Sequence, residues 1–381
     1  MLWQLNLRHL RAMAAIVRLG SVSAAAQAVS ITQPAITQGL AKLEGQLATT
    51  LFERQPDGMQ RTIAADIFAP RVERALAHIG NARVTTAQLR ALIALAEGGS
   101  YAGASALTGL AQPTLHRALA DLAIALRRPL LERRGRGIGF TESGRRTIHN
   151  FRLARAELEA GLAELENLKG REVGRISVGA MPLSRARVLP AAVAAFHARY
   201  PEVQISIAEG AFGELIEPLR DGDLDLMIGA LRDQSPGADI EQRSLFFDRP
   251  AIVARKGHPL AGKSPTILDL ANYRWVMPPA GTPLHSLWRL MFDENGLELP
   301  DVPIECGSVI TIRQLLIASD FLTLLSPDQV AVELEAEWLA IIAEAPPGLS
   351  RNIGISTRAG WQPTALQAAF VAQIEQTVQG L

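Results

Sequence analysis

Residues 21–54 read SVSAAAQAVSITQPAITQGLAKLEGQLATTLFER. The alanine-rich part, about Ser23 to Val29, predicts a short helix, and only a tight connection separates it from a second one. Thr32 is a good N-cap for that second helix, and Pro34 lies in its first turn, where a missing N–H costs nothing. Two short helices around a tight turn, the second with polar residues near its start, form the helix-turn-helix arrangement that fits a DNA major groove.

The residues on either side complete a small domain. Apolar residues from Leu7 to Val17 recur at helical spacing, and Gly20 stops that helix. In the helix after Thr32, one apolar stripe faces inward, made of Ile36, Leu40, Leu43 and Leu47. Behind it, Leu51 to Arg54 and Met59 to Ile63 flank a Pro-Asp-Gly turn signal, which predicts a small hairpin, or wing.

The whole unit occurs twice. From Leu10 onward the sequence returns from Leu89 at a constant offset of 79 residues, without a gap. The repeated residues include Gly20 and Ser21 (Gly99 and Ser100), Gln33 and Pro34 (Gln112 and Pro113), four leucines, and Thr62 (Thr141). A register kept over fifty residues indicates a duplicated domain, so the chain carries two helix-turn-helix copies.

Outward-facing polar and basic residues in both copies are the candidate DNA contacts. In copy one they are Thr32, Gln33, Pro34, Thr37 and Gln38 on the helix, with Arg54 and Arg61 on the wing. In copy two they are Gln112, Thr114, His116 and Arg117 on the helix, with Arg133, Arg134 and Arg136 on the wing. Copy two is the more basic of the two.

These residues resemble the N-terminal winged helix-turn-helix of LysR-type transcriptional regulators. Copy one matches the family's spacing at Ala25-Ala26, Thr32-Gln33-Pro34-Ala35, Leu43-Glu44 and Leu51-Phe52-Glu53-Arg54. Copy two departs more: Ala123 stands at the position of Glu44, and Arg127 at a position where the family usually has glycine, which is Ala48 in copy one. Ordinary members carry a single such domain, so the tandem makes this chain an atypical member.

The division of labour between the copies stays open. One reading makes one copy a structural or dimer-forming remnant; the other, which we prefer, has both copies touch DNA. Positive charge governs non-specific affinity, so copy two is then expected to supply more of the salt-dependent binding.

A long helix follows copy two. From Glu142 to about Lys169 there is no proline, and leucines 158, 162, 165 and 168 recur at three- and four-residue steps. The resemblance implies a linker helix that pairs two subunits. A helix that packs on its own chain would show the same pattern, so that alternative stays open.

From residue 171 onward, the spacing of apolar residues changes from a purely helical period to an alternation of strands and helices. Strands at Arg175 to Gly179 and Val203 to Ile207 alternate with helices at Leu189 to Tyr200 and Phe212 to Arg220, which predicts an α/β domain with parallel strands. The stretches Gly174 to Gly179, Tyr200-Pro201, Gly222 to Leu226, Gly257 to Leu260 and Ser326-Pro327 resemble the family's effector domain. The resemblance implies two lobes of the periplasmic-binding-protein type (type 2), crossing near residues 230–233 and 330–334.

The resemblance also implies where an effector binds, in a cleft between the lobes. The loop after the first strand, a loop in the second lobe and the start of the following helix supply the groups: Pro182, Leu183 and Ser184; Pro279, Ala280, Gly281 and Thr282; Ser308, Val309, Ile310 and Thr311. Backbone N–H groups at helix starts favour a carboxylate or another anion.

The expected domain order is therefore copy one (1–66), a connecting helix (67–84), copy two (85–146), the linker helix (147–170) and the effector domain (171–381). Charge supports it. Residues 1–170 hold 21 Lys+Arg against 13 Asp+Glu, and the remainder holds 17 against 25. A basic first half suits a polyanion and an acidic second half does not, so charge assigns DNA to the first half.

Composition bounds the class of protein. Hydrophobic residues are 48% and charged residues 20% of the chain, a globular balance. No stretch is apolar enough for a membrane span, the start reads as an amphipathic helix and not as a signal peptide, and the single Cys306 fits a reducing compartment. The cytoplasm is the expected location.

Catalytic and metal chemistry find no support in the sequence. The seven histidines have no pair at metal-ligand spacing, and Cys306 lacks a resolving partner and is interpreted as a core residue. The resemblance places Asp223 and Asp225 at a turn into a buried strand, where helix or turn capping explains them. No cofactor is expected.

The leading hypothesis is an effector-controlled, sequence-specific transcriptional regulator and not an enzyme. It acts as a homodimer or homotetramer and is able to contact RNA polymerase. The alternative is a small-molecule-binding protein or enzyme whose N-terminal half does not bind DNA.

Overall fold

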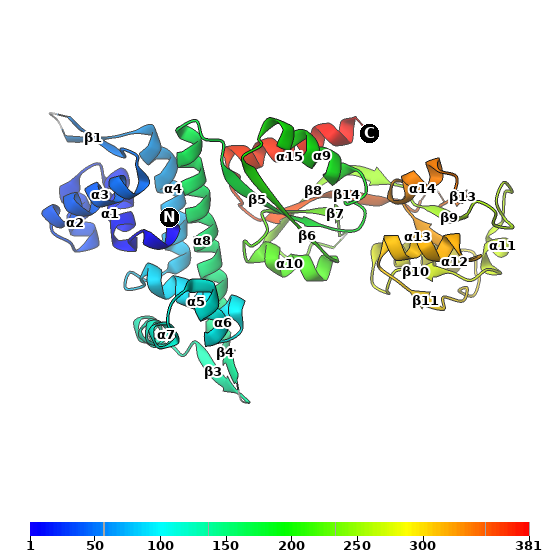
Figure 1. Ribbon diagram of the computed structural model, residues 1–381, viewed down its shortest axis with the longest axis horizontal. Coiled ribbons are helices and arrows are strands. Elements are labelled where there is room, and N and C mark those ends of the chain that lie inside the picture. Colours follow the sequence, from blue (N-terminus) through cyan, green and yellow to red (C-terminus); the bar gives the residue numbers. More distant parts are fainter. Residues whose placement is uncertain (56–57, 136, 233, 347, 381) are drawn as a thin grey trace. The chain divides into compact units, whose positions relative to one another are not determined.

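The fold is described from a computed structural model that covers residues 1–55, 58–135, 137–232, 234–346 and 348–380. The chain forms two compact units (Figure 1). The first holds residues 1–174 with Asp221–Asp223, and the second holds residues 175–220 and 224–381. Within the described residues, no helix is long and apolar enough to cross a membrane.

Both helix-turn-helix copies form in the first unit, and the offset of 79 residues holds for the start of each of the six repeated elements; the last helix, α8, runs ten residues further than its counterpart α4. Copy one, after a short 3-10 turn η1 (Leu2–Gln4), has α1 (Leu7–Leu19), α2 (Val22–Val29), α3 (Gln33–Leu47), β1 (Phe52–Gln55), β2 (Gly58–Arg61) and α4 (Ile63–Ile79). Copy two has α5 (Thr86–Gly98), α6 (Tyr101–Thr108), α7 (Gln112–Leu126), β3 (Leu131–Arg134), β4 (Gly137–Phe140) and α8 (Glu142–Leu168). The two wings are antiparallel β1–β2 and β3–β4 hairpins.

Equivalent residues make equivalent hydrogen bonds in the two copies. Ser21 and Ser100 each accept a hydrogen bond from the backbone N–H three residues on and so cap α2 and α6. Thr62 and Thr141 cap α4 and α8, and their hydroxyls also donate to the carbonyls of Thr50 (2.9 Å) and Pro129 (2.8 Å). The sequence repeat therefore includes the side chains whose hydrogen bonds define the helix starts.

The ends of α3 and α7 carry backbone strain at one equivalent position. Ala48 (φ 47°) and Arg127 (φ 54°) both adopt the left-handed conformation, which ordinary L-residues avoid at a cost of about 1–2 kcal/mol. These are the positions where the family usually has glycine, and the chain keeps the turn geometry without it.

The helix α8 packs along α4 of the same chain (Figure 1). Its expected leucine stripe is covered there: Leu158 is 2% and Leu165 1% exposed, while Leu168, near the end of the helix, is 46% exposed. The surface expected to meet another subunit is thus filled by the chain's own first linker helix. The duplication explains this outcome, because it supplies a second linker helix within one polypeptide.

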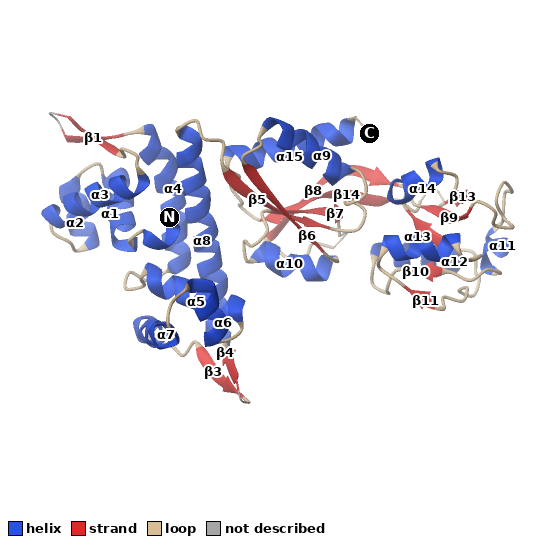
Figure 2. Ribbon diagram, in the orientation of Figure 1, coloured by secondary structure: helices blue, strands red, loops and turns tan. Residues whose placement is uncertain are grey.

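The second unit contains two lobes, each with its own core. Lobe one has the sheet order β6-β5-β7-β14-β8, and Figure 2 shows α9 and α15 on one side of it and α10 on the other. Its elements are β5 (Gly174–Ala180), α9 (Val188–Arg199), β6 (Val203–Glu209), α10 (Phe212–Arg220), β7 (Leu226–Ala230), β8 (Ile240–Asp248), β14 (Arg351–Arg358) and α15 (Ala365–Gln379). The four elements predicted from Arg175 to Arg220 are confirmed. Strand β5 runs parallel to β7, whereas β14 runs antiparallel to β7 and β8.

Lobe two has the sheet order β12-β9-β13 and a small parallel pair β10-β11 around a core that includes Trp275, Trp288 and Phe292. Its elements are β9 (Ala251–Arg255), α11 (Ile267–Ala271), β10 (Val276–Met277), α12 (Pro283–Asp293), β11 (Ile304–Glu305), α13 (Val309–Ile317), β12 (Thr323–Leu325), η2 (Pro327–Val330), α14 (Ala331–Glu335) and β13 (Leu339–Glu344).

The crossings between the lobes lie elsewhere than predicted. The chain passes from β8 to β9 at Arg249-Pro250 and returns to lobe one between the end of β13 at Glu344 and the start of β14 at Arg351. The prediction of crossings near 230–233 and 330–334 was wrong. Strand β7 ends at Ala230, and Leu231 and Arg232 follow it inside lobe one, whereas residues 330–334 belong to η2 and α14 inside lobe two. Prolines break the ladder at the true crossings, because a residue without an N–H cannot continue it.

Replacing either strained residue with glycine is expected to stabilise the N-terminal unit. Ala48→Gly and Arg127→Gly each remove the left-handed penalty, partly offset by the greater freedom of glycine in the unfolded chain, for a net gain of about 0.5–1 kcal/mol. Hydrogen–deuterium exchange of the α3 and α7 amides measures it. The control Ala41→Gly, in the exposed interior of α3, should lose about 1 kcal/mol. A loss at Ala48 equal to that at Ala41 would contradict the strain argument.

A second prediction concerns the close approach of α4 and α8. A Cβ built on Gly161 would lie 2.8 Å from Cδ2 of Phe68, whereas one on Gly45 of α3 would meet nothing within 4 Å. Both glycines are inside helices, so alanine gains the same helix propensity, about 1 kcal/mol. We expect Gly45→Ala to stabilise and Gly161→Ala to destabilise the N-terminal unit, the latter by about 1–3 kcal/mol, as read by exchange of α4 and α8 amides. Equal stabilisation by both would refute this account of the contact.

Candidate DNA-binding and effector sites

The outward flank of α3 is set by its inward leucines. Leu40, Leu43 and Leu47 are at most 4% exposed, which leaves Thr32, Gln33, Pro34, Thr37 and Gln38 exposed as predicted. Thr32 occupies the N-cap, but its side chain makes no capping hydrogen bond, and the hydroxyl stays at the surface. The first turn of α3 therefore presents hydroxyl and amide groups that are able to hydrogen-bond base edges or phosphates.

Helix α7 presents the same flank with different side chains. Leu115, Leu119 and Leu122 are buried, and Gln112, Thr114, His116 and Arg117 are exposed. A hollow of about 580 Å³ lies beside its first turn, lined by Tyr101, Ser105, Gln112, Pro113 and His116. The Tyr101 and His116 rings lie 5.5 Å apart, and burial raises the pKa of Tyr101, which keeps its hydroxyl protonated.

The wings are positioned differently in the two copies. In copy one, Oε1 of Glu44 accepts hydrogen bonds from the N–H groups of Leu51 (2.7 Å) and Phe52 (3.1 Å), so α3 holds the start of its own wing. Copy two has Ala123 at that position and lacks the contact. The replacement of glutamate by alanine at this position therefore leaves the second wing without the carboxylate that holds the first.

The predicted wing arginines are only partly described. Arg61 is exposed and forms an ion pair with Asp66 at 2.9 Å, and Arg133 is exposed on β3. The side chains of Arg54 and Arg134, and the whole of Arg136, lie outside the described residues.

The predicted effector residues fall into two groups. At the end of β5, Pro182 is half-buried, and Leu183 and Ser184 are buried. The Ser184 hydroxyl is fully buried, within hydrogen-bond distance of the carbonyls of Met181 (2.9 Å) and Ile228 (3.1 Å). It ties β5 to β7, so its hydroxyl is not free for an effector, contrary to the prediction.

The other two predicted segments come together at one edge of lobe two. Strands β10 and β11 are parallel, so the loops after them are neighbours, and a Cβ on Gly307 would lie 3.8 Å from Pro279. Thr282 caps α12 and Ser308 caps α13, each accepting a hydrogen bond from a backbone N–H at 3.4 Å. The other predicted residues in these segments are Ala280, Gly281, Val309, Ile310 and Thr311, of which Val309 is half-buried and the rest are exposed. Two helix N-termini thus lie side by side, an arrangement that favours an anion.

Sequence reasoning missed a set of arginines at the carboxyl edge of the lobe-one strands. Arg185 and Arg187 follow β5, and Arg232 follows β7, whose end is adjacent because the strands are parallel. The guanidinium of Arg232 lies 4.5 Å from the centre of the Phe212 ring, and burial lowers its pKa. Among the described residues no carboxylate pairs with Arg232. A basic residue directly after a predicted parallel strand was the available signal, since ligands of open α/β sheets bind at that edge.

The neighbouring arginines are paired. Arg185 bonds Glu209 in lobe one, and Arg187 reaches Asp328 of lobe two at 3.2 Å. Arg187 and Asp328 therefore link the two lobes by an exposed ion pair.

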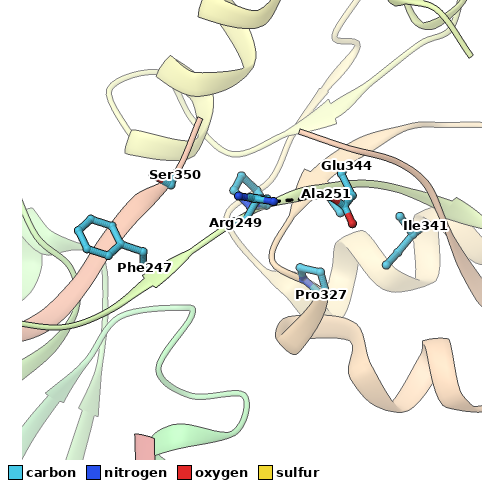
Figure 3. A pocket seen from close by; sticks show the side chains of 8 residues that line it. Phe247, Arg249, Ala251, Pro327, Ile341, Glu344 and Ser350 are labelled. Atoms are coloured by element: carbon cyan, nitrogen blue, oxygen red, sulfur yellow. Dashed lines mark ion pairs between the residues drawn. The ribbon is translucent and has the colours of Figure 1, made fainter. Parts of the chain in front are cut away.

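A hollow of about 420 Å³ lies at the crossing strands (Figure 3). It is lined by Phe247, Arg249, Pro250, Ala251, Pro327, Ile341, Glu344 and Ser350, and Arg249 pairs with Glu344 across it at 3.8 Å. None of the predicted effector residues lines this hollow, so it is a feature of the hinge and distinct from the helix-start edge of lobe two.

Other reactive groups have structural roles. The carboxylate of Asp225 accepts a hydrogen bond from the N–H of Ser177 at 2.7 Å, and burial raises its pKa. Cys306 is half-buried against the core of lobe two. Within the described residues no group of three metal-binding side chains gathers.

Comparisons with known families agree with this division. Residues 7–66, and again residues 86–145, match the family described as "Bacterial regulatory helix-turn-helix protein, lysR family". Residues 169–379 match the family described as "LysR substrate binding domain". The regulator GalR of Pseudomonas putida is 33% identical over 98% of this chain and 97% of its own length. The SDS degradation transcriptional activation protein of a Pseudomonas species is 32% identical over 72% of this chain and 90% of its own length.

Solved structures show the same fold. Full-length CbnR in complex with its target DNA has a TM-score of 0.56 and 21% identity, covering 76% of this chain and 98% of that chain. An OxyR variant from Pseudomonas aeruginosa has a TM-score of 0.58 and 20% identity, covering 78% and 98%. Each match leaves about a quarter of this chain uncovered, a share close to the length of one repeat.

The exposed Arg133 provides a test of phosphate contact. Arg133→Ala is expected to weaken binding to every duplex alike and to reduce the slope of log affinity against log salt by about one, because one phosphate contact is lost. Arg289→Ala, an exposed arginine on α12 in the other unit, is the matched control and should leave the slope unchanged. Fluorescence anisotropy at several salt concentrations measures both. An unchanged slope for Arg133→Ala would remove that wing from the interface.

Proposed function

This chain belongs to the LysR family of DNA-binding transcriptional regulators, and we propose that it binds operator duplex through both α3 and α7 while a small anionic effector binds in its C-terminal domain. The observation that carries the DNA half is that both helix starts are exposed on leucine-packed scaffolds, within a half of the chain that holds 21 Lys+Arg against 13 Asp+Glu. A helix whose start carries exposed amide, hydroxyl and guanidinium groups suits a major groove.

The proposal of an anionic effector rests on one positively charged side chain and on backbone N–H groups at two helix N-termini. Arg232 is a half-buried cation over an aromatic ring, and α12 and α13 direct their N-termini to one edge of lobe two. An anion would offset the desolvation that lowers the pKa of Arg232. The proposed effector contacts are Arg232, Pro182, the segment Pro279–Thr282 and the segment Ser308–Thr311, through backbone groups where the side chain is apolar.

Control follows as a population shift. The effector must bind two arrangements of the chain with different affinity, because a ligand that binds both equally shifts neither. The ion pair between Arg187 and Asp328 joins the two lobes. An anion that competes with Asp328 for Arg187 would weaken this link and so change the relative free energies of the two arrangements.

The remaining assignments follow from this role. The chain works in the cytoplasm, where its DNA target lies, without catalysis, as a homo-oligomer able to contact RNA polymerase. Since α4 covers the stripe of α8, the contacts between chains fall outside that pair of helices.

A gel-shift titration with the chain's own upstream DNA, at two salt concentrations, tests the DNA half. We expect affinity that falls with salt and that exceeds affinity for a scrambled duplex by about 10³-fold or more. Affinity that ignores both sequence and salt would end the proposal.

The effector half is tested by thermal shift with benzoate, succinate and inorganic phosphate, with glucose as the uncharged control. We expect at least one anion to raise the melting temperature of the wild-type chain, because a ligand that binds only the folded state stabilises it by mass action. Arg232→Leu should lose that shift, whereas Arg289→Leu, an exposed arginine on α12, should keep it. Stabilisation by glucose alone, or an undiminished shift in Arg232→Leu, would contradict an anion site at Arg232.

A further inference from the structure

We propose that one copy of this chain supplies both members of a paired DNA-binding unit, and that its operator consists of two half-sites of different sequence about one duplex turn apart. The inference rests on the proposed DNA binding of both copies. It adds that the pair is internal to one polypeptide and unequal in what it reads.

The pairing of α4 and α8 has the form of a two-fold pair. The residues Val72, Ala75 and Ile79 of α4 correspond under the repeat to Phe151, Ala154 and Leu158 of α8, and all six are at most 4% exposed. Phe68 packs against Gly161. Arg71 bonds Glu164 at 2.8 Å and Glu157 at 3.4 Å, so low numbers on one helix meet high numbers on the other. The helices are antiparallel, and equivalent residues lie at the middle of the contact.

The ends of the two helices support the recognition helices crosswise. Lys169, just after α8, donates to the carbonyl of Leu47 at the end of α3, at 2.7 Å. Asn81, just after α4, donates to the carbonyl of Ala125 near the end of α7, at 3.1 Å. Each recognition helix is therefore held by the linker helix of the other copy. This exchange is what a symmetric dimer would show, and here it occurs within one chain.

The same contacts set the spacing of the two copies. Phe68 lies near the start of α4, whereas Gly161, its contact, lies near the end of α8. The starts of α4 and α8 are therefore separated by about 24 residues along the pair, or roughly 36 Å at 1.5 Å per residue. Each start carries its own helix-turn-helix, and α3 and α7 lie toward opposite ends of the pair (Figure 1). Two half-sites one turn apart on B-DNA are about 34–36 Å apart, so the separation suits successive major grooves.

A second chain is not needed to complete the pair. The apolar residues of the two helices are already covered, and one continuous core runs through both copies from Leu2 to Leu165. Burying the same surface against another chain would require opening this contact.

The two recognition helices differ where they face outward. Under the repeat, Ala35, Thr37 and Gln38 of α3 correspond to Thr114, His116 and Arg117 of α7, and all six are exposed. A glutamine pairs best with adenine, and an arginine with the O6 and N7 atoms of guanine. A pair built from unequal members prefers an operator that is not a palindrome, with adenine at the position read by Gln38 and guanine at the position read by Arg117.

Selection of duplexes from a random library by the full-length chain tests this directly. We expect two different half-sites with centres about 10 base pairs apart. Gln38→Arg should change the preferred base in one half-site to guanine, and Arg117→Gln should change the preferred base in the other to adenine. Each variant is the matched control for the other. An enriched palindrome, or both variants changing the same half-site, would overturn the inference and leave the proposed DNA binding intact. Absence of any enriched sequence would instead end the proposed function.

Spacing and stoichiometry give an independent readout. Inserting five base pairs between the selected half-sites turns them to opposite faces of the duplex and should weaken binding at least tenfold, whereas inserting ten should weaken it less. Because the chain is proposed to be a homo-oligomer, native mass spectrometry with an excess of a duplex that carries one pair of half-sites should show as many bound duplexes as chains. Two chains required for one pair of half-sites, or no effect of the five-base insertion, would contradict an internal pair.

Discussion

The contact between α4 and α8 is the interaction on which the N-terminal half depends. Its centre is apolar, but Arg71, 5% exposed, is buried beside it with Glu157 and Glu164. Burial alone would lower the pKa of Arg71; the two carboxylates outweigh that effect and raise it. A buried charge is tolerated only while its partners remain, and loss of one partner costs about 3–5 kcal/mol. Because both partners are on α8 and the arginine is on α4, this ion cluster fixes which helices pair and in what register.

Much of this architecture could be predicted from sequence, for a physical reason. The repeat preserves capping residues as well as leucines: Ser21, Ser100, Thr62 and Thr141 stand at the starts of α2, α6, α4 and α8. Helix starts and apolar stripes are local signals. The helix that covers an apolar stripe can lie far away in the sequence. Leucines 158 to 165 therefore predicted that a partner helix exists but did not identify α4 as that helix.

The effector domain shows the same limit. The alternation of strands and helices up to Arg220 was visible, but the crossings depend on which strands pair across the sheet, and a proline at a crossing resembles a proline at any turn. The family resemblance assigned Ser184 to the effector site because it lies in the loop after the first strand, yet its hydroxyl is buried against the carbonyl of Ile228 in β7. Arg232 also follows a strand, but the contact with Phe212, twenty residues earlier, and the parallel pairing of β5 with β7 are not visible in the sequence.

The proposed binding of DNA by both copies of one chain has consequences for how an operator is recognised. In a homodimer the two recognition helices are identical, so the favoured operator is symmetric. The protein then has no preferred orientation along the duplex. Tethered copies are free to differ, because a substitution such as glutamine to arginine at one recognition helix does not alter the other. The second contact is then intramolecular, with an effective concentration that can reach the millimolar range, so pairing on DNA does not require chains to meet. Unequal half-sites also fix the orientation of the bound chain on the duplex.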